Sequence, residues 1–481
     1  MKPKPLLLSL AALLVAAAAG SAWWFQGASE QQSRVAAVLP PPPDLSAAPA
    51  PMRAALAAAA ERAHSLRHAR DGFAELVQLY HANGFLDAAL HGYAGLAALE
   101  PDQPRWPHFH ASILAGYGDV EPAIALWQRV VALAPDYLPA RLRLGDSLLK
   151  NNQLDEAAAT YTAVLERAPG DAYAQLGLAR IDLEAERWNQ ARERLETIVR
   201  ATNYELGYDL IVSLYERLGE TDRALAIRGS AKALGSFRDP PDPWVDALID
   251  LCYDPYRISL AAGVAGRTGD SARGRALLER AIELAPGDVS TRFQLGTLAL
   301  QQGDTATARD QFERCTILAP DFSDAWAQLS ALQARLGDPA GAARTLATGL
   351  RHCPESPGLH LMQARTFRQA GRIEEAINEF MVSINLRPNE PEAFIELGSM
   401  LVSVGRTDEG IEQLRRSLDT DPANPVALSI LAFHAISTGD EAETDRWMSR
   451  IADQPRVTRE QSSRLHAAYR QQFGREWQPK R

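Results

Sequence analysis

Apolar runs alternate with short polar turns along most of the chain, and four stretches show the pattern almost unchanged. They are "LAPDYLPARLRLG" (133–145), "LAPGDVSTRFQLG" (284–296), "ILAPDFSDAWAQLS" (317–330) and "LRPNEPEAFIELG" (386–398). In each, an apolar run meets a proline, polar residues follow, and a large side chain stands three residues ahead of a leucine and a small residue. Because proline lacks an amide proton and disfavours helix in the residue before it, the pattern predicts that one helix ends and another begins.

The prolines of this pattern recur at a fixed interval. Intervals of 34 residues separate Pro101, Pro135 and Pro169, and the same interval separates Pro286, Pro320, Pro354, Pro388 and Pro422. Six equal intervals indicate an internal repeat. The distance between Pro169 and Pro286 is three periods and 15 additional residues, so the sequence predicts an insert or a change of register there.

Other positions of the repeat also form columns. The twentieth position carries a small residue, which allows two helices to approach closely, at Ala89, Ala123, Ala157, Ala191, Ala224, Ala308 and Ala376. The fifteenth position carries Gly or Asn, at Gly84, Gly118, Asn152, Gly219, Gly269, Gly303, Gly337, Gly371, Gly405 and Gly439. A helix that ends in the left-handed conformation needs such a residue, so each unit is predicted to be a helix-turn-helix.

The unit Ser323 to Ser356 shows the whole pattern. Its fourth, seventh, eighth, twentieth, twenty-fourth and thirty-second positions are Trp326, Leu329, Ser330, Ala342, Leu346 and Pro354. This order resembles the signature of the tetratricopeptide-repeat family, with Ser for the usual Gly and Leu for the usual Phe. Eleven such units cover Arg70 to about Thr458. The resemblance implies an all-α fold, a right-handed α-solenoid superhelix of helix-turn-helix repeats with a concave groove.

The repeats divide the chain into segments. Residues 70–237 hold repeats one to five, residues 238–254 form a helical insert, and residues 255–458 hold repeats six to eleven. Because a repeat buries its apolar face only against its neighbours, the ends need polar caps, which we expect at residues 52–69 and in the helix and tail of residues 459–481. In the insert, helical spacing of its apolar residues predicts a short helix packed where repeats five and six meet, as a spacer or a docking site: Trp244, Leu248, Leu251 and Cys252.

Residues 1–25 are predicted to be a transmembrane anchor or a signal sequence. Lys2 and Lys4 precede an uncharged run from Leu6 to Phe25, which has about the length that a membrane-spanning helix needs. The aromatic residues at the end of this run favour an anchor, because such residues gather at membrane interfaces. A cleaved signal peptide is the alternative, since small residues at positions 20–22 offer a cleavage site.

Either interpretation places the repeats outside the cytoplasm, in the periplasm if the cell is Gram-negative. Residues 26–51 are rich in Pro and Ala and are therefore expected to form a linker that holds the repeats off the membrane. Pro40 to Pro43 in its centre favour an extended, semi-rigid conformation.

Composition and motifs narrow the function. The formal net charge is −10 and the pI is about 5.6, whereas a nucleic-acid-binding surface needs a basic face, so no nucleic-acid partner is expected. The sequence has no GxSxG, P-loop, HExxH or Rossmann motif and no CxxC, and His64 and His68 lack further ligands at zinc spacing. It therefore predicts a non-enzymatic protein without a cofactor, a metal site or an evident small-molecule substrate. Cys315 is expected to be structural.

By the resemblance, positions 2, 5, 9, 12 and 13 of each repeat face the concave groove. In repeats six to nine, these positions hold one acidic residue, Asp324, and a group of four arginines and two aromatic residues. The group consists of Arg267, Arg335, Arg365, Arg368, Tyr256 and Phe293. Arginine can bind a carboxylate through two hydrogen bonds, and aromatic residues supply contact area. The hypothesised ligand of this groove is therefore an acidic, partly apolar segment of a partner.

The resemblance implies a scaffold that binds a protein or peptide partner along its groove, and the N-terminal segment adds the expectation that this scaffold is membrane-tethered and extracytoplasmic. An accessory or chaperone-like subunit of an envelope assembly, secretion or enzyme complex is the alternative. Purely architectural self-association is a third possibility.

Overall fold

The computed structural model describes residues 23–201, 205–231, 240–452 and 457–478, and in these ranges every regular element is a helix. A helix over residues 23–36 is followed by α2 (Ala50–Ala63), α3 (Ala69–Ala82), α4 (Leu86–Leu99), α5 (Arg105–Tyr117), α6 (Val120–Leu133), α7 (Leu138–Lys150), α8 (Leu154–Arg167), α9 (Ala172–Glu184), α10 (Trp188–Ala201), α11 (Glu205–Arg217) and α12 (Thr221–Ala231). The insert contains the short α13 (Pro243–Asp246) and the 3-10 helix η1 (Ala247–Leu251).

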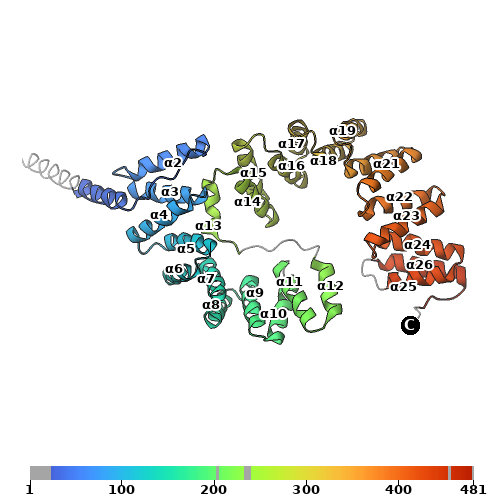
Figure 1. Cartoon of the computed structure of the whole chain (residues 1–481), viewed down its shortest axis with the longest axis horizontal. Coiled ribbons are helices and arrows are strands. Elements are labelled where there is room, and N and C mark those ends of the chain that lie inside the picture. The colour runs from blue at the N-terminus through green and yellow to red at the C-terminus, as the bar shows by residue number, and fades with distance from the viewer. Residues whose placement is uncertain (1–22, 202–204, 232–239, 453–456, 479–481) are drawn as a thin grey trace, which may run out of the picture. The chain divides into compact units, whose positions relative to one another are not determined.

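The remaining helices follow one another to the C-terminal end (Figure 1). They are α14 (Pro255–Arg267), α15 (Ser271–Leu284), α16 (Val289–Gln301), α17 (Thr305–Leu318), α18 (Ser323–Arg335), α19 (Pro339–His352), α20 (Pro357–Gln369), α21 (Ile373–Leu386), α22 (Pro391–Ser403), α23 (Thr407–Thr420), α24 (Pro425–Thr438), α25 (Glu441–Ala452) and α26 (Arg459–Phe473). The predicted all-α solenoid of helix-turn-helix repeats is confirmed.

Tight turns join the two helices of each repeat. In the described residues eleven pairs occur, from α3/α4 to α11/α12 and from α14/α15 to α24/α25. Nine of their turns contain a glycine with positive φ, and Asn152 has a φ of 58°. The fourth pair uses Glu186, with a φ of 56°, a residue that the sequence pattern did not single out. A glutamate in this conformation carries strain that glycine would avoid.

Side chains at the start of several second helices satisfy free amide groups. Asp270, Asp304 and Asp338 precede α15, α17 and α19, and each carboxylate accepts a hydrogen bond from the amide three residues ahead. Such caps stabilise a helix by about 1 kcal/mol each.

Small residues allow the paired helices to approach closely. A Cβ atom on Gly296 of α16 would lie 2.7 Å from Cε1 of Phe312 in α17. A Cβ atom on Gly145 would lie 2.7 Å from Cε1 of Tyr161. The large partner side chains, Phe312 and Tyr161, are fully buried. In these two repeats the eighth position is therefore a glycine because an aromatic ring of the second helix occupies the place of its missing side chain.

Each pair also packs on the next one. The first helices of successive pairs contact each other, as α7 does with α9, α18 with α20 and α22 with α24. At the C-terminal end α26 packs on α24, with Leu465 and Tyr469 buried. Trp477 is buried beyond α26, and its Nε1 donates to Asp445 at 3.0 Å.

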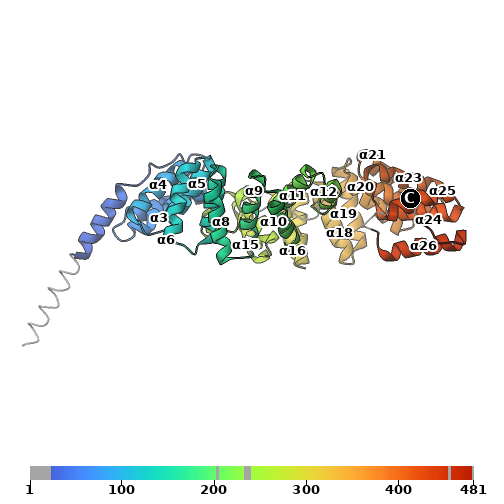
Figure 2. The same cartoon turned by 90° about the horizontal axis from the view of Figure 1, so that it is seen from below.

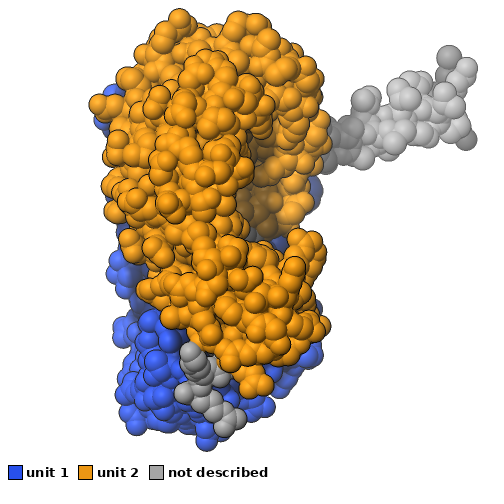
Figure 3. Space-filling model, turned by 90° about the vertical axis from the view of Figure 1, so that its right-hand side faces the viewer, with its two compact units in different colours: residues 1–261 blue, residues 262–481 orange. Residues whose placement is uncertain are grey.

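The chain divides into two compact units, residues 1–261 and residues 262–481, and the division falls within α14. Figure 3 colours these two units separately, and we call them the N-terminal and the C-terminal unit. Figure 2 shows the helices of the same repeats from a second direction.

Most of the predicted anchor, residues 1–22, lies outside the described residues. The first described residues, Trp23, Trp24 and Phe25, are 80%, 46% and 55% exposed and are helical. Among the residues that the structure describes, no helix has the length and apolar character needed to cross a membrane.

The segment predicted as a linker is more ordered than its composition indicates. Its first eleven residues belong to the helix over residues 23–36, and Val35 in that helix is 1% exposed. Val38 lies against α4, because a Cβ atom added to Gly95 would be 2.9 Å from the Cβ of Val38. Pro40 to Pro43 are not helical, as predicted from their missing amide protons. The segment therefore packs on the first repeat, because its few apolar residues find a surface there.

Candidate partner-binding surfaces

From its position in the sequence, the insert was predicted to pack where repeats five and six meet. The described residues of the insert pack elsewhere. Instead, η1 contacts α3 of repeat one, and α13 lies beside α3 and α5 in Figure 1. Hydrogen bonds join it to Asn83 of repeat one, to His108 of repeat two and to Tyr137, the residue just before α7. The reason for the difference is chemical, because these side chains complement the polar groups of the insert.

Asp242 is a buried residue of the insert whose carboxylate bonds two side chains of the repeats. Its Oδ2 lies 2.8 Å from Nε2 of His108, and its Oδ1 accepts from the hydroxyl of Tyr137 at 2.5 Å. Nδ1 of His108 accepts from Nε1 of Trp127 at 3.3 Å, and an indole only donates, so Nε2 carries the proton that is donated to Asp242. Burial alone would raise the pKa of Asp242, but the hydrogen bonds from His108 and Tyr137 outweigh it and hold the pKa below its ordinary value.

Trp244 supplies the largest contact of the insert. Its ring stacks on that of Tyr137, with centroids 3.6 Å apart and planes 8° from parallel. The guanidinium of Arg105 also lies over the Trp244 ring, 5.7 Å from its centroid. The backbone amide of Trp244 donates to the Tyr137 hydroxyl at 3.1 Å. Tyr137 therefore contacts both the backbone and the aromatic ring of this residue.

Asn83 holds the other end of the insert through main-chain atoms. Its Nδ2 donates to the carbonyl of Leu251 at 2.9 Å, and its Oδ1 accepts from the amide of Tyr253 at 2.7 Å. A pair of bonds like this fixes an extended backbone whatever its side chains are. We call Asn83, Arg105, His108 and Tyr137 the insert-binding surface.

Two of the arginines predicted to line the C-terminal groove already have partners. Arg365 donates through Nε to both carboxylate oxygens of Glu396, at 2.9 and 3.1 Å, and through Nη2 to Glu392 at 2.5 Å. Arg368 lies 3.2 Å from Glu396. Both glutamates come from α22 of repeat ten, so this part of the groove balances two positive charges with two negative ones.

The other candidates of this groove differ in their surroundings. Phe293 packs edge-on against Phe322 and tilted against Phe312, with centroids 5.1 and 5.5 Å away, so much of its ring belongs to the core. Arg267 and Arg335 are exposed at the ends of α14 and α18. Tyr256 is 70% exposed and belongs to the N-terminal unit, whereas the other five candidates belong to the C-terminal unit.

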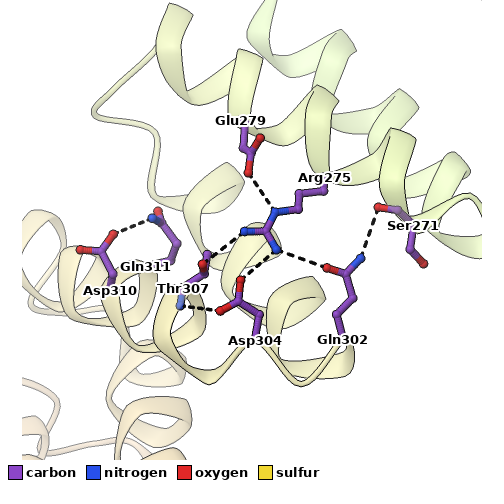
Figure 4. Close-up of polar contacts among 8 residues, drawn as sticks. All are labelled: Ser271, Arg275, Glu279, Gln302, Asp304, Thr307, Asp310 and Gln311. Carbon is purple, nitrogen blue, oxygen red and sulfur yellow. Dashed lines mark hydrogen bonds and ion pairs between the residues drawn. The ribbon is translucent and has the colours of Figure 1, made fainter.

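An open cleft of about 420 Å³ lies between α15 and α17, with Leu295 of α16 beneath it. Figure 4 shows Arg275 at the centre of its polar contacts, where it donates to Glu279 and Asp304 at 2.9 Å each and to Thr307 at 3.2 Å. Hydrogen bonds from Thr307 and Arg275 lower the pKa of Asp304 to about 2. Because the guanidinium is already bonded to acceptors of repeats six and seven, the cluster acts as a brace between them.

The cysteines and histidines have structural surroundings. Cys252, Cys315 and Cys353 are buried, and burial raises the pKa of the Cys315 thiol to about 11, which keeps it protonated and unreactive. In the part of the chain that the structure describes, no three His, Cys, Asp or Glu residues gather to hold a metal ion. His108, which the sequence left without a role, instead binds Asp242.

Models of the tetratricopeptide repeat match residues 114–172, 148–203, 259–321, 328–391 and 361–425. Together these matches span just over half of the chain. The chain therefore belongs to the tetratricopeptide-repeat family. A search of curated proteins found no match.

Several solved structures contain similar helical repeats. Yeast Tom70 is 15% identical, over 84% of this chain and 96% of its own, with a TM-score of 0.40. PilW, described as a widely conserved type IV pilus biogenesis factor, is 16% identical over 44% of this chain and 98% of its own, with a TM-score of 0.37. A thermophilic tetratricopeptide-repeat protein of Thermus thermophilus is 19% identical over 41% of this chain and 99% of its own, with a TM-score of 0.30. At such identities the likeness concerns the fold alone.

Proposed function

We propose that this tetratricopeptide-repeat protein is a membrane-tethered, extracytoplasmic scaffold that binds a protein partner on the first helices of repeats six to eleven. The observation that carries the proposal is that these helices expose arginines and apolar side chains at the positions that face the groove in the family. Arg267 and Arg335 are examples of the first kind, and Val426 and Phe433 of α24, 44% and 38% exposed, are examples of the second. Exposed apolar residues beside arginines are typical of protein-binding surfaces.

The tether is supported by residues at the start of the chain. Lys2 and Lys4 before the apolar run favour an N-terminus that stays in the cytoplasm. Trp23 and Trp24 lie at the end of this run and are exposed, which suits a position at the membrane interface. Because the helix that contains them leads into a segment packed on repeat one, the first repeat would lie near the membrane surface.

A protease-protection experiment tests the location. With intact cytoplasmic membranes, we expect a protease added outside to digest the repeats, and the full-length protein to remain with membranes after a carbonate wash. Recovery of the protein in the cytosol would contradict the proposal. A soluble protein beginning near Trp23 would instead identify a cleaved signal peptide and refute the tether.

Cross-linking in intact cells tests the partner surface. We expect one stoichiometric protein to be captured, and capture to weaken when Arg365 and Arg368 are both replaced by Ala, because a partner carboxylate would share their guanidinium groups with Glu396. A loss of about 1 kcal/mol or more of binding free energy per anchor is expected. The matched control is Arg387→Ala, since Arg387 is also exposed and paired with a glutamate but lies at the end of α21. Equal capture by a folded double variant would refute this surface.

A further inference from the structure

The insert is held in the way that a bound peptide is held. Of residues 240–254, only Pro240, Asp242, Leu248 and Cys252 are buried. Its elements, α13 and η1, have four and five residues and are too short to be stable by themselves. The conformation of the insert therefore depends on the surface beneath it.

The surface beneath the insert has the character of a recognition site. It meets the insert with a carboxamide, an imidazole, a phenol and a guanidinium, from Asn83, His108, Tyr137 and Arg105. Water can hydrate each of these groups when the insert is absent, whereas an apolar surface would lose stability. The repeats could therefore stay folded with this surface empty.

We propose that the insert-binding surface recognises a segment of a partner protein that carries a carboxylate two residues before a tryptophan, and that residues 240–254 occupy this surface in cis until such a segment displaces them. His108 and Tyr137 select the carboxylate, the ring of Tyr137 selects the tryptophan, and Asn83 holds the backbone that follows. Arg105 adds a positive charge that favours an acidic segment. This site is separate from the surface of repeats six to eleven, so its test is independent of the proposed function.

A labelled peptide tests the recognition directly. The probe is a fluorescein-labelled peptide of residues 240–254, added to the full-length chain and followed by fluorescence anisotropy. In the wild-type chain the cis segment competes at a high effective concentration. The full-length variant Asp242→Ala/Trp244→Ala, whose own insert has lost its anchors, should therefore bind the peptide at least about tenfold more tightly.

Control variants separate recognition from general effects. Pro241→Ala, at an exposed position of the insert, should bind the peptide as weakly as the wild-type chain does. A peptide with the same two anchors replaced by Ala should bind the vacated chain at least about tenfold more weakly than the natural peptide. Equal binding of both peptides, or no gain in the double variant, would overturn the proposal. Loss of helical circular dichroism in the double variant would also overturn it, because the insert would then be part of the folded core.

Hydrogen exchange on the wild-type chain gives a second readout that needs no substitution. Excess unlabelled peptide should accelerate exchange of the amides in residues 240–254 and leave α3, α5 and α7 protected. Loss of protection in α3, α5 and α7 together with the insert would contradict an exchangeable occupant, as would no acceleration at all. A concentration-dependent dimer that Asp242→Ala/Trp244→Ala abolishes would assign the surface to a second copy and refute cis occupancy.

Discussion

Repeats one to five and repeats six to eleven have the same helix-turn-helix architecture, but residues on and next to their first helices bind different partners. In the first group, His108 and Tyr137 bind a segment that lies more than a hundred residues further along the chain. In the second group, Arg365 and Arg368 bind glutamates of the next repeat. The helix pairs, turns and small-residue contacts are alike in both groups, so these features determine the fold and leave the groove free to vary.

The comparison also shows how the same kind of surface can be satisfied in two ways. In repeats one to five, the insert covers the insert-binding surface, and its Asp242 carboxylate accepts hydrogen bonds from His108 and Tyr137. In repeats six to eleven, arginines of one repeat pair with glutamates of the next. These pairs link adjacent helices but leave apolar residues such as Phe433 exposed. The first arrangement suits regulated access, and the second suits a surface that meets its partner directly.

The largest expected effect comes from a substitution that should unfold one group of repeats and spare the other. Gly296→Leu places a side chain where Phe312 already lies, and such overpacking costs about 1–3 kcal/mol or more. Because stacked repeats depend mainly on their neighbours, repeats six to eight should lose hydrogen-exchange protection while repeats one to three keep theirs. Gly287→Leu is the control, since a Cβ there meets no atom within 4 Å. Uniform loss of protection along the chain would contradict this expectation.

Acid should weaken the N-terminal repeats through His81. Burial, together with the charge of Arg257 and the proximity of His108, lowers the pKa of His81 to about 4, below its ordinary value of 6.5. The unfolded state therefore binds a proton first as the pH falls, so this stabilisation is present above pH 6.5 and is lost progressively toward pH 4. We expect the loss to be on the order of 3 kcal/mol.

Denaturation at several pH values, followed by exchange in α3 and α4, measures this effect. His81→Asn retains a group at the position of Nδ1, which bonds the Tyr93 hydroxyl, but cannot titrate in this range. Its stability should change less between pH 6.5 and pH 4 than that of the wild-type chain. Equal slopes for the two proteins would show that His81 is not responsible.

A smaller effect is expected from the charge pairs of the C-terminal groove. A double-mutant cycle with Arg365→Ala and Glu396→Ala should give a coupling energy of about 0.5–1 kcal/mol, because both side chains are only partly exposed, at 34% and 20%. The coupling should decrease with added salt. Additive effects of the two substitutions would indicate that the pair does not link repeats nine and ten.

The smallest effect concerns the turn of the fourth repeat. Glu186→Gly should stabilise the chain by up to about 1 kcal/mol, because glycine adopts a φ of 56° without strain. Thermal unfolding of the N-terminal repeats measures it. Glu184→Gly, a change within α9, should instead destabilise them. A lower melting temperature for Glu186→Gly would contradict the assignment of strain.

The sequence was sufficient to predict the repeats because their signals are local. A proline ends one helix and a glycine with positive φ ends the other, and both effects act within a few residues. Glu186 escaped this reasoning, since glutamate seldom adopts the left-handed conformation. The linker was only partly predictable, because composition does not reveal that Val35 is buried or that Val38 lies against Gly95 of the first repeat.

The candidate sites depend on contacts between residues that are far apart in the sequence, so they were harder to predict from the sequence. Helical spacing correctly marked Leu248 and Cys252 as buried residues of the insert, but it could not show which surface buries them. The pairing of Arg365 was missed because Glu396 stands at the sixth position of its repeat, which the groove pattern does not include, and because Glu392 belongs to repeat ten, outside repeats six to nine. Nothing in the sequence indicated that His108 binds Asp242, which lies 134 residues further along the chain.

Photo-cross-linking of the purified full-length chain tests the central comparison most directly. A photoreactive amino acid would replace Arg105 in one protein and Phe433 in another, and the products would be mapped by mass spectrometry. We predict that position 105 links to residues 240–254 of the same chain in a monomeric product, and that position 433 does not link to that segment. A link from position 433 to residues 240–254, or none from position 105, would contradict the account.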